Sequence, residues 1–462
     1  MAGDMSFLWL RPAIEMEIFC DCANRKGYFV TVYGLSLCST SPVDDDMMKN
    51  ALTHLFRKVP SLRTCFRKRE NTLWACEMIH EQLDFQVTET KDLVTATEEL
   101  FNYKFPTTEG PLWCARLLPS TSPFPSSQPD LIPSSDFPHT RTLLLANHHG
   151  IADGTTNIFI AQSLLQILDD MITGKPVDDK VQMGNVASGE ETKVILTAMV
   201  KRLREDKDRL QSIIEDINKS RKAEKLIPQT FPMPMDSNYR VEMVLQDLDK
   251  ETTQKFFKRC KQEGVTVNSA MTAVINVSLV DFVREGGLEQ DTYTIHELHG
   301  INMRRYWSGN TNGTLGCHML LPRVLFSTPA KWREGFWEYT RTIHDTIVRG
   351  LEEKDAFLSL LEMVEGASPE TIFEKRPYSE CDYAIGNIGN VDNRITTKMQ
   401  NVQLCHLVRS VSCWNDPMYS FFHTLNGCFA YSLVYCNDVL TREMASRFLD
   451  ITFDNIRAVT QQ

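Results

Sequence analysis

The sequence lacks the patterns that would assign the protein to a membrane or to a nucleic acid. It contains no run approaching the roughly 20 apolar residues that span a bilayer, and the apolar stretch at 7–10 is too short for a signal peptide. Lys and Arg form no dense block, and the formal net charge of -11 repels phosphate backbones. We therefore expect a cytoplasmic protein with no transmembrane segment and no nucleic-acid partner.

Paired cysteine motifs are also missing, although the chain has thirteen cysteines. None has CxxC spacing, and Cys20 and Cys22 form the closest pair. An odd number of scattered cysteines without such spacing is typical of reduced thiols that pack as small apolar residues. We expect neither a disulfide framework nor a cysteine metal site.

The length of 462 residues exceeds what one hydrophobic core usually supports, which predicts two lobes. The proline-bearing segment 227–237 ("IPQTFPMPMDS") is the expected connector, so the lobes are predicted at 1–226 and 238–462. Within the first lobe, 119–140 contains six prolines and six serines and reads as a flexible surface insertion. Strands and helices alternate irregularly in both halves, which favours two α/β lobes over one doubly wound sheet.

Local patterns predict several individual elements. Alternation of apolar and polar residues over 16–39 suggests a hairpin, and acidic residues after Pro42 suggest a helix that ends near Lys58. A near-continuous apolar run at 143–148 predicts a strand buried on both faces. It is followed by a broad apolar face over 155–172, which predicts a helix. A further long helix is expected over 191–226.

The two adjacent histidines in "NHHGIADG" admit three interpretations. A metal site needs at least three convergent ligands, whereas His148 and His149 point in opposite directions on an extended backbone, so we expect no metal. Simple packing would explain either histidine alone. It would not explain a histidine at a strand end, a glycine at 150 that permits a sharp turn through positive φ, and Asp153 at a helix start. This combination predicts one imidazole exposed in a cleft.

"HHGIADG" resembles the HHxxxDG motif of the CoA-dependent acyltransferase superfamily, which includes chloramphenicol acetyltransferase and peptide-synthetase condensation domains. Other segments resemble the family in the same order along the chain. They are "FPTTEGPLWCARLL", "GVTVNSAMTAVINVSL", "INMRRYW" with "LGCHM", and "AIGNIGN". The DFGWG motif of the plant branch is absent, so an alcohol-acetyltransferase-like or condensation-like branch fits better.

The resemblance implies an α/β fold of two chloramphenicol-acetyltransferase-like lobes. Each is a mixed sheet with flanking helices, and the active-site tunnel lies between them. It implies that His149 is the catalytic base, and a histidine suits proton removal at neutral pH. We expect partial burial to keep that imidazole neutral. Asp153 is implied to be structural and paired with Arg304, with Arg305 as the alternative.

Three further residues of the motif regions carry smaller expectations. Gly154 is expected to allow close packing at the helix start. His148 and Asn387 are candidate tunnel or oxyanion residues. For His148 the alternative is packing away from the tunnel, and for Asn387 it is a structural place in a loop.

The leading functional hypothesis is an acyl-CoA-dependent O- or N-acyltransferase acting on a small acceptor. Acyl-CoA would be a co-substrate, with no bound cofactor, and transfer would be direct without an acyl-enzyme. A second hypothesis is a condensation-type enzyme whose acyl donor is bound to a carrier protein. A third is a non-catalytic ligand-binding protein that retains the fold. We expect a monomer.

Overall fold

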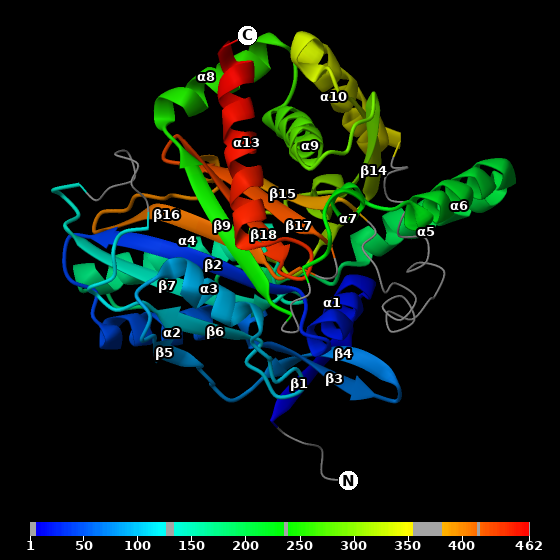
Figure 1. Ribbon diagram of the computed structural model, residues 1–462. Helices are drawn as coiled ribbons and strands as arrows, with labels where there is room; N and C mark the ends of the chain where they lie inside the picture. The colour runs from blue at the N-terminus through cyan, green and yellow to red at the C-terminus, as the bar shows by residue number, and fades with distance from the viewer. Residues whose placement is uncertain (1–5, 126–133, 235–238, 354–380, 414–415, 462) are drawn as a thin grey trace.

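The computed structural model describes residues 6–125, 134–234, 239–353, 381–413 and 416–461. Two mixed sheets, each flanked by helices, form the centre of the molecule (Figure 1), which confirms the predicted two-lobed α/β fold. The five-stranded sheet has the order β16 (Val402–Val411), β2 (Val30–Ser39), β7 (His139–His148), β6 (Trp113–Leu117) and β5 (Phe85–Val87). The six-stranded sheet has the order β14 (Arg323–Pro329), β10 (Thr292–His299), β15 (Tyr383–Asn390), β17 (Met418–Leu425), β18 (Cys428–Cys436) and β9 (Val241–Leu248).

Smaller strands complete the sheet structure. A three-stranded sheet contains β1 (Phe7–Pro12), β4 (Thr72–Met78) and β3 (Thr64–Arg69). Two short pairs consist of β11 (Ile301–Asn302) with β13 (Met319–Leu320), and of β12 (Thr314–Leu315) with β8 (Asn185–Val186). The β12–β8 pair joins the two halves of the chain.

Helices pack on both sheets because each presents an apolar stripe to them. On the side of the five-stranded sheet lie α2 (Asp45–Lys58), α3 (Leu93–Phe101) and α4 (Gly154–Thr173). On the side of the six-stranded sheet lie α8 (Lys250–Gln262), α9 (Val267–Glu285), α10 (Phe336–Glu353) and α13 (Arg442–Gln461). In Figure 1, α5 (Glu190–Glu205) and α6 (Lys207–Lys222) extend to the right of both layers.

One strand crosses from the second half of the chain into the first sheet. β16 pairs antiparallel with β2, with Val411 opposite Thr31 and Val402 opposite Ser39. The segment expected to form the C-terminal lobe, 238–462, therefore supplies the edge strand of the other sheet. Strand propensity predicts that a segment is extended but not which neighbour it pairs with.

The same pair of strands corrects the expectation for the cysteines. Cys38 of β2 and Cys405 of β16 form a disulfide, with their Cα atoms 6.2 Å apart. They are separated by 367 residues along the chain, so no local spacing motif could reveal them. The eleven remaining cysteines are free thiols, and all of them are buried.

The predicted hairpin over 16–39 is wrong in its first half, which forms the helix α1 (Glu15–Arg25) before β2 begins. The residues Met16, Phe19, Cys20 and Ala23 repeat at three- and four-residue intervals, and all are buried. This set fits a helical period as well as an alternating one, and tertiary packing selects the helix.

The long helix expected over 191–226 is interrupted. α5 ends at Glu205, and the side chain of Asp206 accepts a hydrogen bond from Arg209 N (3.1 Å), capping the start of α6. The expected connector begins with the short helix α7 (Leu226–Thr230), and residues 235–237 lie outside the described residues. An aspartate at this position favours a new helix start because its carboxylate satisfies an otherwise unpaired N–H.

Among the described residues, no single helix has both the length and the apolar composition needed to cross a membrane. Only α8 and α9 taken together meet those two criteria, and they are bent by 105° at the break between them.

The crossover of β16 predicts that the first lobe cannot fold alone. All ten residues of β2 are buried, and without β16 one edge of that apolar strand would be exposed. We expect a fragment of residues 1–226 to show no cooperative unfolding transition in urea, measured by circular dichroism. Co-expression with 227–462 should restore the transition. A fragment that unfolds cooperatively by itself would contradict this dependence.

Candidate active site

The turn between β7 and α4 sends the two adjacent histidines in opposite directions. His148 is fully buried and its ring packs against Phe66 and Phe105, with ring centroids 5.5 and 6.2 Å away. Its Nδ1 accepts a hydrogen bond from Gly150 N (3.0 Å). His148 does not line the pocket described below, which favours packing over a tunnel or oxyanion role for this residue.

The need for glycine at position 150 comes from space and not from positive φ. A Cβ atom there would lie 2.9 Å from the Phe66 ring and 3.0 Å from the His148 ring. Gly150 is absent from the glycines with positive φ, so the expected reason for it is wrong. The packing of His148 against Phe66 leaves no room for a side chain between them.

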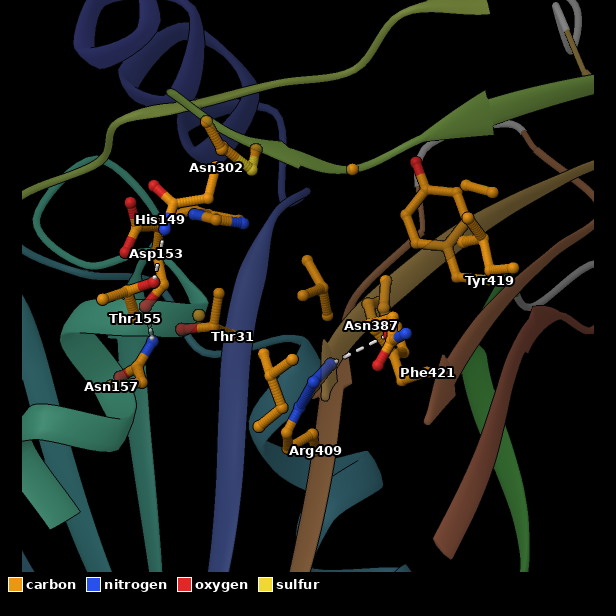
Figure 2. A pocket seen from close by; sticks show the side chains of 18 of the residues that line it. Thr31, His149, Asp153, Thr155, Asn157, Asn302, Asn387, Arg409, Tyr419 and Phe421 are labelled. Carbon is orange, nitrogen blue, oxygen red and sulfur yellow. Dashed lines mark hydrogen bonds between the residues drawn. The ribbon is translucent and has the colours of Figure 1, made fainter. Parts of the chain in front are cut away.

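His149 lies on the wall of a pocket between the two sheets (Figure 2). Its ring stands edge-on to Phe29, and its Nδ1 lies 3.7 Å from Cys317 Sγ. Because Cys317 does not line this pocket, Nε2 is the ring nitrogen left to face it.

The pKa of His149 is raised from its usual value, although the sequence predicted a neutral base. Burial lowers the pKa of His149, but the contact with Cys317, a hydrogen bond to its own backbone and the nearby Asp153 together raise it by more than burial lowers it. The pKa of the Cys317 thiol is itself raised well above 9, by its hydrogen bond with Cys20 and by burial. The sulfur therefore stays protonated at neutral pH, and we attribute its favourable effect to Sγ accepting the Nδ1 hydrogen.

Asp153 joins three parts of the site. As the N-cap of α4, its Oδ1 accepts a hydrogen bond from Thr156 N (2.9 Å). Its Oδ2 forms an ion pair with Arg304 Nη1 (2.5 Å) and also accepts from His318 N (2.8 Å). Arg304 and Asp153 are both buried. Burial raises the pKa of Asp153, but the Arg304 guanidinium, His318 and the hydrogen bond from Thr156 N together lower it to below its usual value. Asp153 accordingly stays ionised.

Arg304 makes further hydrogen bonds to residues near Asp153. Its Nη2 donates to Thr156 Oγ1 (3.1 Å) and to Gly316 O (3.0 Å), and its Nε donates to Thr314 O (3.1 Å). The neighbouring Arg305 is exposed, so the structure brings Arg304 and not the alternative to Asp153. The network links the start of α4 to the segment that carries β12 and Cys317.

Gly154 lies close to Ile388, the residue that follows Asn387 in β15. A Cβ atom on Gly154 would lie 2.9 Å from Ile388, so α4 approaches β15 closely at this point. Asn387 lines the pocket, but its Nδ2 donates to Asn268 Oδ1 (3.0 Å) and its Oδ1 accepts from Gly389 N (2.7 Å). Both the nitrogen and the oxygen of the amide are therefore already hydrogen-bonded within the protein.

The pocket encloses about 940 Å³ of space not occupied by atoms, part of it open to solvent. Figure 2 shows His149, Asp153, Thr155 and Asn157 on one side of it, and Asn387, Tyr419 and Phe421 on the other. β2, the residue that precedes it, and β16 supply further lining residues that the sequence did not single out, because they belong to no motif. They are Phe29, Thr31, Tyr33, Arg409, Ser410 and Val411.

A group with metal-binding side chains lies behind the imidazole. The ligand atoms of Cys20, His149 and Cys317 lie within 4.8 Å of one another, and all three residues are buried. Two sulfurs and one imidazole nitrogen are ligands that Zn²⁺ accepts, with a fourth position open. The sequence places only His148 beside His149 as a possible ligand and does not reveal this group, since α1 and the segment after β12 meet only in the fold.

The arrangement of the whole chain matches solved structures of acyl-transferring proteins. Trichothecene 15-O-acetyltransferase from Fusarium sporotrichioides covers 98% of this chain and 96% of its own, with a TM-score of 0.72 and 14% identity. The condensation domain of the Monacolin K polyketide synthase covers 99% and 98%, with a TM-score of 0.64 and 14% identity. The first condensation domain of the calcium-dependent antibiotic synthetase covers 98% and 96%, with a TM-score of 0.67 and 10% identity.

The chain has the fold of CoA-dependent acyltransferases and condensation domains. No protein-family model and no curated protein matches the sequence. The likeness therefore lies in the three-dimensional arrangement, and the chemistry has to be argued from the residues of this pocket.

The buried ion pair predicts a large effect of Asp153→Ala. The variant would leave the Arg304 guanidinium buried without its counter-charge, a change that costs about 3–5 kcal/mol. We expect the free energy of unfolding in urea to fall by that amount. Asp92→Ala is the matched control, because Asp92 caps α3 through Thr95 N (2.7 Å) but is exposed and makes no ion pair with the described residues. It should cost about 1 kcal/mol. Equal losses of unfolding free energy in the two variants would refute the structural role of the Asp153–Arg304 ion pair.

Buried neutral histidines predict that stability falls at mildly acidic pH. Burial lowers the pKa of His148 to about 3 and that of His318 to about 4. Below about pH 6.5 the unfolded chain binds protons at these sites that the folded protein does not. Each site then removes up to about 1.4 kcal/mol per pH unit as the pH falls towards 4.

Two groups oppose this trend because the folded state binds their protons more tightly: the pKa of His149 is raised, and burial raises the pKa of Asp382 to about 6. Urea unfolding measured between pH 7.5 and 5 tests the balance. We expect lower stability at pH 5, and an unchanged or higher value would contradict the histidine assignment.

Proposed function

We propose that the protein is an acyltransferase that moves an acyl group from a thioester donor to a hydroxyl or amine of a small acceptor, with His149 as the general base. The observation that carries the proposal is the orientation of His149 in the pocket between the sheets. Its Nδ1 is held by Cys317 Sγ (3.7 Å), and its Nε2 faces the pocket. His149 is the only histidine among the described residues that line this pocket.

The chemistry follows from that orientation. With the proton on Nδ1, Nε2 removes the acceptor proton while the acceptor oxygen or nitrogen attacks the thioester carbonyl. The tetrahedral intermediate collapses by breaking the carbon–sulfur bond. The departing thiolate takes the proton back from Nε2, so the enzyme ends unchanged. No side chain forms a covalent intermediate, and the reaction needs no bound cofactor or metal.

Asp153 and Arg304 support this reaction without touching the substrate. Their ion pair fixes the start of α4 against the segment that carries Cys317, and Cys317 in turn contacts His149. A base held in one geometry loses less entropy on reaching the transition state. Asp153 is thus a positioning residue.

We propose acyl-CoA as the donor, and a carrier-protein-bound acyl group is the alternative. The likeness to trichothecene 15-O-acetyltransferase supports transfer to a hydroxyl of a small molecule. The likeness to condensation domains supports the carrier alternative. A non-catalytic role is less well supported, because His149 and the Asp153–Arg304 ion pair are both present. We further propose a monomeric cytoplasmic enzyme.

The test is a screen of acyl-CoA donors with detection of released thiol, with and without candidate acceptors, for the wild type and for His149→Ala. We expect the substitution to lower kcat by about 10²- to 10⁴-fold because it removes the proton transfer, while the variant still unfolds cooperatively. His80→Ala, at an exposed histidine outside the pocket, is the matched control and should keep full activity.

The pH dependence gives a second readout. Because the base must be neutral and the pKa of His149 is raised, kcat/KM should increase with pH through a value above 6.5. Undiminished transfer by His149→Ala would falsify the proposal. Activity only with carrier-bound donors would replace acyl-CoA by the alternative.

A further inference from the structure

Arg409 places a buried positive charge on the wall of the pocket without a counter-charge. Its side chain comes from β16, it is only 4% exposed, and it lines the pocket together with Gly386 and Phe421. Its Nη2 donates to Gly386 O (3.1 Å), and its guanidinium lies 5.8 Å from the centre of the Phe421 ring. Its Nε and Nη1 have no hydrogen-bond partner among the described residues.

The surroundings of Arg409 add positive charge and no negative charge. Arg394 lines the same pocket at an exposed position, and it makes no ion pair with the described residues. Tyr33 also lines the pocket, but burial raises its pKa, so its hydroxyl keeps the proton. Burial and the nearby Arg394 both lower the pKa of Arg409. The site is thus electrostatically unfavourable for the cation it contains.

The one carboxylate on the described lining, Asp153, is already neutralised by Arg304. Taking an arginine out of water is costly unless a counter-charge and acceptors replace the water. The hydrogen bond to Gly386 O and the contact with Phe421 engage part of the guanidinium, but neither supplies a negative charge. A ligand with an anionic oxygen supplies both missing elements, since a guanidinium pairs well with carboxylates.

We propose that Arg409, with Arg394 nearer the solvent, forms a carboxylate-binding subsite, so that one of the two reaction partners carries a carboxylate group. The functional interpretation of this subsite rests on the proposed acyl transfer, whereas binding of a carboxylate can be measured without it. The carboxylate can belong to the acceptor, as in a hydroxy acid, or to the acyl group, as in the half-thioester of a dicarboxylic acid. The acidic chain as a whole, with its net charge of -11, thus contains a locally basic pocket.

The first experiment measures binding without turnover, in the His149→Ala background. Thermal unfolding and calorimetric titration compare pairs of ligands of which one member carries a carboxylate and the other lacks it. 4-Hydroxybenzoate against 4-hydroxybenzamide probes the acceptor, and malonyl-CoA against acetyl-CoA probes the donor. We expect the carboxylate member of one pair to bind at least about tenfold more tightly, since a hydrogen bond to a charged group is stronger than a neutral one. The pair that shows the preference identifies the source of the carboxylate.

The second experiment removes the charge with Arg409→Met, which keeps a side chain of similar reach. We expect the preference for the carboxylate member to be lost, while the neutral member binds within about twofold of its original affinity. Arg394→Met should weaken the same preference by a smaller factor, because Arg394 is exposed to solvent. Arg457→Met, an exposed charge on α13, is the matched control and should change neither.

Stability separates a binding role from a structural one. Because Arg409 is buried without an ion pair, Arg409→Met should unfold at the same or a higher temperature than the parent protein. A marked loss of stability would assign Arg409 to the fold and overturn the proposal. Equal binding of charged and neutral members in both pairs would overturn it as well.

Failure of the proposed acyl transfer would appear differently. Donors would then stay unreacted in the wild type, while the carboxylate preference in the His149→Ala background would persist. The two conclusions can therefore fail independently.

Discussion

The ion pair between Asp153 and Arg304 is the contact on which the geometry of the pocket depends. Both groups are buried, so each requires the other: removing either would leave a charge in a medium that solvates it poorly. The pair also fixes direction. It anchors the start of α4 beside the segment that carries Cys317, whose Sγ contacts His149 Nδ1. Stability and the orientation of the base therefore rest on one interaction.

The crossover of β16 has a comparable role for the other wall. By pairing with β2 it forms an edge of the first sheet, and by the same placement it brings Arg409 into the pocket that His149 also lines (Figure 2). The pocket is thus lined by strands of both sheets and by both halves of the chain. In the proposed function, His149 transfers the proton and Arg409 recognises a carboxylate, so that the two steps use different walls of one cavity.

The two adjacent histidines lie in different environments because the chain turns directly after them. His148 is sealed among aromatic rings, and its pKa falls to about 3, so it is a neutral packing group. His149 meets Cys317 on one side and the pocket on the other, and its pKa is raised. The sulfur contact also means that this base is accompanied by two buried thiols, a setting in which thiophilic ions find ligands. Local environment, and not residue type, assigns the roles.

The sequence by itself determined the strand that ends at His148, the helix that begins after Asp153, and the two-lobed α/β class. These follow from hydrophobic period, capping residues and a motif that are all local in the chain. The pairing of Asp153 with Arg304 was expected only through a resemblance. Tertiary structure alone decided that 16–25 is helical, that β16 joins the first sheet, and that Arg409 and Cys317 reach the site. Each depends on contacts between residues far apart in sequence, which no local period encodes.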